Sequence, residues 1–161
     1  MQTLTRAFLA SILVLCLFAP MNAQAQFVPV GVEVECDEST IKINVHPEQN
    51  APVTVSCTVT NTGSFAQNVD LDSNLDGNDF SLSLSESSVE LEAGEDASFT
   101  ATFSASPRIA VVSEDFNITA TVTSATIGSD PFTIPLGQMG STSETGGSVS
   151  SLPYSRMDLE L

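Results

Sequence analysis

One acidic, glycine-containing segment holds the side chains of this sequence that are best suited to binding a metal. Asp72, Asn74 and Asp76 occupy alternate positions, and Gly77 follows them directly. In calcium loops the oxygens at positions 1, 3 and 5 converge on the ion, and a glycine permits the sharp turn that comes next. The spacing therefore predicts a partial calcium site formed by Asp72, Asn74, Asp76 and Asp79.

This segment does not complete an EF-hand. The twelfth position should be a bidentate glutamate, and here it is Ser83. The alternation of Phe80, Leu82 and Leu84 with serines indicates that a strand has already begun. We expect a loop over residues 73–79 with affinity for calcium in the millimolar range. The alternative interpretation is an Asx-rich turn between two strands, with no metal.

Two cysteines of the predicted mature chain, Cys36 and Cys57, are expected to form a disulfide. An even pair in an exported protein usually does so, and both side chains lie in phase with inward-facing valines of their strands. The closed loop of about 20 residues would contribute roughly 3 kcal/mol in the chain-entropy model. Two buried free thiols are the alternative.

Catalytic chemistry has little support in the sequence. The single histidine, His46, precedes Pro47 and is out of phase with the apolar residues before it, which is typical of a solvated turn residue. No motif ties His46 to a nucleophile. The sequence has no Trp and a single Tyr, Tyr154, so we expect no aromatic-lined cleft around a carboxylate. We predict a protein without enzymatic activity.

A glycosylation sequon is present at Asn117-Ile118-Thr119. Ile118 is in phase with the inward residues of a predicted strand, so Asn117 should point outward. Modification of Asn117 is then sterically allowed.

The first 25 residues have the pattern of a secretory signal peptide. Arg6 precedes an apolar run over 7–19, and Ala23-Gln24-Ala25 matches the small-x-small cleavage rule. The run is shorter than the roughly 20 residues that a membrane span needs. A lipoprotein cut before Cys16 is the alternative, and the bulky Leu15 disfavours it. No second apolar segment follows, so we expect no transmembrane anchor.

The chain is strongly acidic, with a formal net charge of −16. Such a surface repels nucleic acids and anionic lipids, and nucleic acids are therefore excluded as partners. Solubility is the simplest explanation of the scattered acids, which we place at outward strand positions or in turns. They include Glu33, Glu35, Glu48, Asp70, Glu90, Glu92, Glu95, Asp96 and Glu114.

Strict alternation of apolar and polar residues recurs along the chain and defines its fold class. In the run over 53–59, Val53, Val55, Cys57 and Val59 alternate with hydroxyl-bearing residues, as expected of a sheet buried on one side. We predict an all-β, immunoglobulin-like antiparallel sandwich of about seven to eight strands over residues 26–136. The Gly-, Ser- and Thr-rich residues 137–161 are expected to be a flexible tail.

The segment Val59-Thr60-Asn61-Thr62-Gly63 resembles the V-x-N-x-G signature of extracellular immunoglobulin-like modules of the CARDB and NEW3 type, found in secreted and surface proteins of bacteria and archaea. The turn around Val89 to Glu95, the long strand Ala97 to Phe103 and the late strand Phe116 to Val122 follow in the same order. The resemblance implies a scaffold in which Asn61, Gly63 and Gly94 shape turns, and it implies no catalytic residue.

These observations predict a secreted or cell-surface module, with a periplasmic location as a variant, that acts by binding or by structure. Its partner would be a protein or an envelope component, contacted through sheet edges by strand addition or through the tail by docking. The alternative is an extracellular module stabilised by calcium at the loop over 72–79.

Overall fold

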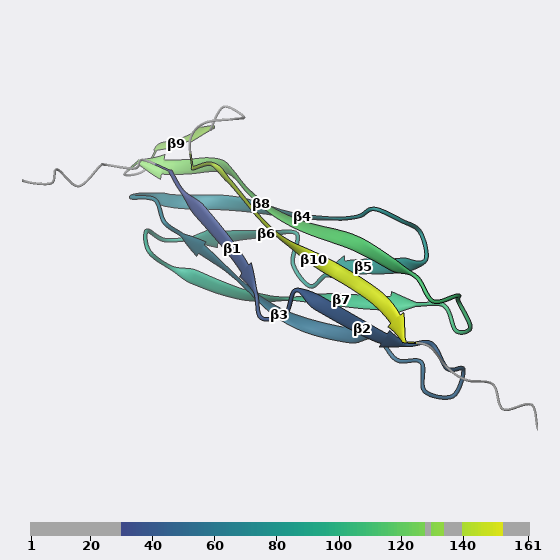
Figure 1. Ribbon diagram of the computed structural model, residues 1–161. Helices are drawn as coiled ribbons and strands as arrows, with labels where there is room; N and C mark the ends of the chain where they lie inside the picture. The colour runs from purple at the N-terminus through teal and green to yellow at the C-terminus, as the bar shows by residue number, and fades with distance from the viewer. Residues whose placement is uncertain (1–29, 128–129, 134–139, 153–161) are drawn as a thin grey trace, which may run out of the picture.

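The computed structural model describes residues 30–127, 130–133 and 140–152 (Figure 1). The predicted signal peptide lies outside the described residues. The strands are β1 (Val32–Cys36), β2 (Thr40–Asn44), β3 (Val53–Asn61), β4 (Ala66–Leu75), β5 (Phe80–Leu84), β6 (Ser88–Leu91), β7 (Asp96–Ala105), β8 (Ser113–Ile127), β9 (Asp130–Thr133) and β10 (Thr142–Leu152). No helix occurs among these residues, and the predicted all-β fold is confirmed.

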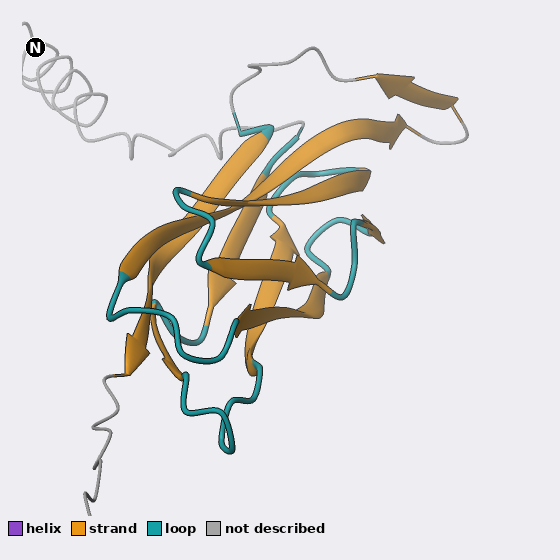
Figure 2. Ribbon diagram, turned by 90° about the vertical axis from the view of Figure 1, so that its right-hand side faces the viewer, coloured by secondary structure: helices purple, strands orange, loops and turns teal. Residues whose placement is uncertain are grey.

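The strands form two sheets that pack face to face (Figure 2). The first sheet has the order β1-β3-β7-β5, and the second has the order β2-β10-β8-β4-β6, with β9 paired to β8. All pairings are antiparallel except that of β10 with β2. Strands that are neighbours in sequence repeatedly lie in different sheets, as in an immunoglobulin-like sandwich.

The core lies between the sheets because each strand turns one set of alternate residues inward. In β3 the inward Val55, Cys57 and Val59 are buried, and the buried Phe99, Ala101 and Phe103 of the neighbouring strand β7 lie beside them on the same face of the sheet. Phe103 meets Phe116 of β8 edge to face, with ring centroids 4.8 Å apart. The predicted alternation is thus the feature that builds the core.

The prediction of a flexible tail is wrong for residues 142–152. They form β10, which lies between β8 and the edge strand β2 in the second sheet. Val149 is fully buried and belongs to the core. The sandwich therefore extends to residue 152 rather than ending at residue 136.

Close packing explains why β10 is so rich in small residues. A Cβ at Gly147 would lie 1.9 Å from the carbonyl oxygen of Ser39, and one at Gly146 would lie 2.7 Å from that of Phe116. Here the glycines mark close backbone approach, which is a use of glycine within strands. The remaining predicted tail residues, 137–139 and 153–161, lie outside the described residues.

Candidate functional site

A buried polar cluster formed by Asn61 and Gln67 joins four segments at one end of the sandwich. Both side chains are at most 1% exposed. Asn61 Nδ2 donates to the carbonyl oxygens of Phe65, Leu91 and Glu92 at 2.8, 3.0 and 2.9 Å. Asn61 Oδ1 accepts from the backbone N–H of Gly63 at 2.8 Å and from Gln67 Nε2.

Gln67 extends this Asn61–Gln67 cluster to the start of β1. Its Nε2 donates to the Gly31 carbonyl at 3.1 Å, and its Oε1 accepts from the Gly31 N–H at 3.3 Å. A Cβ at Gly63 would lie 2.5 Å from Gln67 Nε2 and 2.9 Å from the Gly31 nitrogen. The Asn-x-Gly motif thus has a structural role that goes beyond the predicted turn.

Four edge strands, β1, β2, β5 and β6, differ in how they are protected against pairing with another chain. Charged residues interrupt three of them: Glu33 and Glu35 in β1, Lys42 in β2 and Glu90 in β6. In addition, the open side of β1 is covered by the segment that enters β10. Val32 N–H donates to the Gly140 carbonyl and Val34 N–H donates to Ser143 Oγ. Such charges and covers are the usual means by which edges are blocked.

The fourth edge, β5, carries no charge and no proline. Its sequence is Phe-Ser-Leu-Ser-Leu, and charges appear only outside it, at Asp79 and Glu86. Leu82 and Leu84 face the core side of the strand but are only half-buried. An exposed, alternating and uncharged edge is the type that accepts an added strand.

The hydrogen-bond phase of β5 shows which backbone groups face the open side. Ser85 N–H donates to the Thr100 carbonyl at 2.9 Å, directly beyond the pairing of Leu84 with Ala101. Because hydrogen-bonded and non-bonded pairs alternate in an antiparallel ladder, Ser81 and Ser83 bond to β7. The N–H and C=O groups of Leu82 and Leu84 therefore point away from the sheet.

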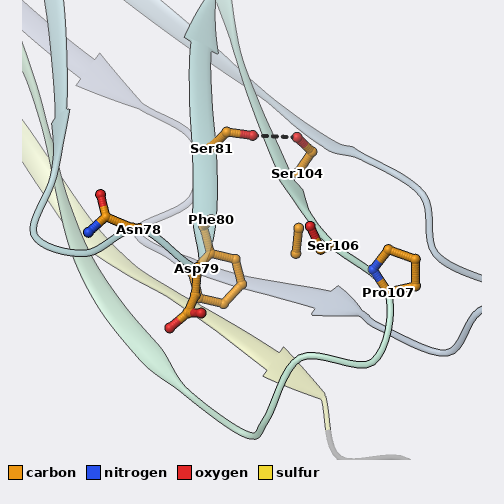
Figure 3. Close-up of a pocket in the computed structure, with 8 residues that line it drawn as sticks. Asn78, Asp79, Phe80, Ser81, Ser104, Ser106 and Pro107 are labelled. Atoms are coloured by element: carbon orange, nitrogen blue, oxygen red, sulfur yellow. Dashed lines mark hydrogen bonds between the residues drawn. The ribbon is translucent and has the colours of Figure 1, made fainter.

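A hollow of about 390 Å³ lies where β5 begins, beside the end of β7 (Figure 3). Ser81 and Ser104 bridge the two strands at its side, with hydroxyl oxygens 2.7 Å apart. The residues that line it are Asn78, Asp79, Phe80, Ser81, Ser104, Ala105, Ser106 and Pro107. It offers room for a side chain next to the β5 edge.

The outer face of the first sheet continues this neutral surface. Ten hydroxyl-bearing residues cover β3, β5 and β7, namely Thr54, Ser56, Thr58, Thr60, Ser81, Ser83, Ser98, Thr100, Thr102 and Ser104. Charged side chains on this face, Glu33, Glu35 and Asp96, stay at the side of β1 and at one end of β7. In a chain of net charge −16, the half of the sheet next to β5 is uncharged.

The predicted calcium residues are not brought together as one loop. Asp72 and Asn74 are exposed residues of β4, paired with Thr119 and Asn117 of β8 on the outer face of the second sheet. The expected loop over 73–79 is shorter, because β4 continues to Leu75. Only Asp76 and Asp79 lie in the turn itself, and both are exposed.

Nowhere in the described part of the chain do three or more His, Cys, Asp or Glu side chains come together in an arrangement fit for a metal ion.

Glu114 is the acidic residue whose position the sequence analysis misjudged. It is 8% exposed, and its carboxylate lies beneath the turn over 76–79. Its phase with Phe116 and Ile118 was the signal that could have placed it inward.

The cysteines form the predicted disulfide. Cys36 and Cys57 are directly opposite one another in the pairing of β1 with β3, with Cα atoms 4.0 Å apart. Cys57 is buried, and Cys36 is half-buried at the end of β1. The bond therefore joins an edge strand to its neighbour within one sheet.

The sequon lies in the middle of the second sheet. Ile118 is fully buried, and Asn117 is half-buried between Asn74 and Gly146. Its glycosylation stays a prediction.

His46 is half-buried after β2, where its Nδ1 accepts from the Glu48 N–H at 3.3 Å.

Comparison with known proteins identifies neither a family nor a function. No protein-family model matches the sequence, and none of the curated proteins does. Among solved structures, the chain is similar to Escherichia coli alpha-2-macroglobulin activated by porcine elastase, with 14% identity and a TM-score of 0.49. That match covers 78% of this chain and 9% of the other, so this chain spans only a small part of that protein.

Two further structures match over most of their length. A FixG-related protein from Vibrio parahaemolyticus is 17% identical, with a TM-score of 0.43 and coverage of 74% of this chain and 94% of that one. The PapD-like domain 7 of human CEP192 is 14% identical, with a TM-score of 0.44 and coverage of 86% and 93%. At these values the fold assignment rests on the strand topology.

Within the described ranges no helix has the length and apolarity that crossing a bilayer requires.

Proposed function

We propose that this chain is a secreted, non-enzymatic module of the CARDB or NEW3 type that binds an extended segment of a partner protein along β5. The observation that carries the proposal is the contrast among the edges. Charges interrupt β1, β2 and β6, whereas β5 has none and keeps two leucines half-buried. The leader-like N-terminus and the disulfide support export.

The added segment would bond to the outward N–H and C=O groups of Leu82 and Leu84, which supply main-chain affinity. Its alternate side chains would cover the two leucines on one face and the hydroxyl-bearing residues on the other. The hollow beside Phe80 would take one further side chain. A partner segment with alternating apolar and small polar residues fits this surface best.

A display library of short peptides, selected on the mature protein, tests the proposal. Selected peptides should protect the Leu82 and Leu84 amides from hydrogen exchange, since these amides have no partner in the sheet. Leu84→Lys should abolish binding because a charge then replaces an apolar side chain that the added strand would cover. Val89→Lys is the matched control, since Val89 is also half-buried in an edge strand, β6.

Selection of peptides that bind both variants equally would contradict the proposal. If instead the mature protein is a dimer that Leu84→Lys converts to a monomer, the added strand is the β5 of a second copy. Size-exclusion chromatography with light scattering distinguishes that outcome from binding of another protein.

A further inference from the structure

Glu114 is a buried carboxylate at the end of the core. It belongs to the inward-facing set of β8, two residues before Phe116, and pairs with Val149 of β10. At 8% exposure it is more deeply buried than an unpaired acidic side chain ordinarily is. The cause is the turn over 76–79, which folds over the carboxylate.

Two contacts hold this turn against Glu114. The Asp79 N–H donates to Glu114 Oε1 at 2.8 Å. Gly77 packs directly on the carboxylate, because a Cβ there would lie 2.0 Å from the same oxygen. The Asp76 N–H donates to the carbonyl oxygen of Asp115 at 3.0 Å, which ties the beginning of the turn to β8.

The second carboxylate oxygen has no such partner. Glu114 Oε2 is buried, and no hydrogen bond reaches it from the described residues. An unpaired buried charge is costly, so buried groups that stay charged are paired or coordinate a metal. The basic residues of the described chain, Lys42 and Arg108, are both exposed, and neither donates to this oxygen.

We propose that Glu114 Oε2 is a ligand of a calcium ion bound under the turn over 76–79. Further oxygens would come from the Asp76 and Asp79 carboxylates and from carbonyl groups of the turn. An all-oxygen donor set of irregular geometry favours Ca²⁺ over Mg²⁺, which demands a near-ideal octahedron.

This site differs from the one that the sequence predicts. Asp72 and Asn74 are excluded because they lie on the outer face of β4, and Glu114 takes the place of the missing glutamate from a distant part of the chain. The exposed Asp76 and Asp79 carboxylates do not converge on Glu114 in the described structure, so they must turn toward the ion when it binds. We therefore expect weak binding, at about 10⁻⁴ to 10⁻³ M, the range of calcium sites in extracellular modules. The inference is independent of peptide binding at β5.

Thermal unfolding of the mature protein tests the site. The protein is measured in 10 mM CaCl₂, in 10 mM MgCl₂ and in EDTA, with NaCl added to equal ionic strength. We expect calcium to raise Tm by several degrees and magnesium to raise it far less. Glu114→Gln should remove the calcium-dependent shift, and Asp79→Asn should reduce it. Asp72→Asn, a control that removes the same charge from β4, should keep it.

Amide chemical shifts provide a second readout that does not depend on stability. Calcium should perturb the amides of residues 76–79 and 113–115 first. The proposal is overturned if the wild type shows neither a Tm shift nor perturbation at these amides. It is equally overturned if Glu114→Gln and the wild type respond alike, since calcium would then act only by screening the surface charge.

Discussion

At the scale of single residues, the contacts of Asn61 and Gln67 explain the structural role of the Asn-x-Gly motif. A buried amide must satisfy its donors and acceptors within the protein. Asn61 does so with carbonyl groups after β3 and at the end of β6, and Gln67 does so with Gly31. The motif thus specifies how four chain segments meet, which a turn residue alone would not do.

Replacing Asn61 with alanine should destabilise the protein strongly. The substitution removes the Asn61 donor from the buried Leu91 carbonyl group and the Asn61 acceptor from the buried Gln67 Nε2, and each buried unsatisfied group costs about 1 to 3 kcal/mol. We expect a loss of about 3 kcal/mol or more in the free energy of unfolding, measured by urea denaturation.

Asn68→Ala is the matched control for this experiment. Asn68 is exposed, and its Nδ2 donates only to Ser124 Oγ on the surface, at 3.0 Å. Its loss should stay within about 0.5 kcal/mol. Equal effects of the two substitutions would show that the Asn61–Gln67 cluster contributes little.

At the scale of strands, β10 joins β2 to the rest of the second sheet. It pairs with β8 along nine residues and with β2 along five, and it supplies the buried Val149. Without it, β2 would have no partner strand in its sheet. The structure therefore makes β10 part of the folding unit.

Truncation after residue 139 should abolish cooperative unfolding. The shortened chain exposes the inner and edge groups that β10 covers, and β2 loses all its pairing. Truncation after residue 152 retains every contact of the described structure and should fold as the full chain does. Circular dichroism during heating distinguishes the two, and a cooperative transition in the shorter chain would contradict the assignment.

The disulfide acts on β1, which is five residues long and pairs with one strand, β3. The bond closes a loop with a sequence separation of 21 residues. The double variant Cys36→Ala, Cys57→Ala should lose about 3 kcal/mol of stability in the chain-entropy model. Urea midpoints of the wild type, with and without reductant, check this value, and a midpoint unchanged by reduction would refute it.

At the scale of the whole molecule, the net charge of −16 dominates the surface. Repulsion among like charges destabilises a compact state and is screened within a Debye length, which is about 30 Å at 0.01 M salt and about 10 Å at 0.1 M. The neutral region around β5 stands out against this background.

Sodium chloride should consequently stabilise the protein. We expect Tm to rise by several degrees between about 0.01 M and 0.5 M NaCl, with most of the change below 0.1 M because screening acts there. Differential scanning calorimetry measures the effect. A Tm that falls or stays constant over this range would show that the acidic side chains are too far apart to repel one another appreciably.

The sequence by itself determined the fold class, most strand positions and the disulfide. Each depends on a local property: the period of two places Val55, Cys57 and Val59 on one face, and that face has to be buried. The same local rule was sufficient to place Ile118 inward and Asn117 outward.

Only the tertiary structure decided the role of β10, the cover over the Glu114 carboxylate and the difference among the edges. The glycines of β10 predict a flexible tail when only the sequence is considered. What requires them is close packing against the backbone of residues far away in the sequence, Ser39 and Phe116. The phase of Glu114 with Phe116 could have placed it inward, but the turn that covers its carboxylate belongs to a segment 35 residues earlier. Edge strands can be identified only when the strand order is known. Strand order is set by long-range packing that no local pattern encodes.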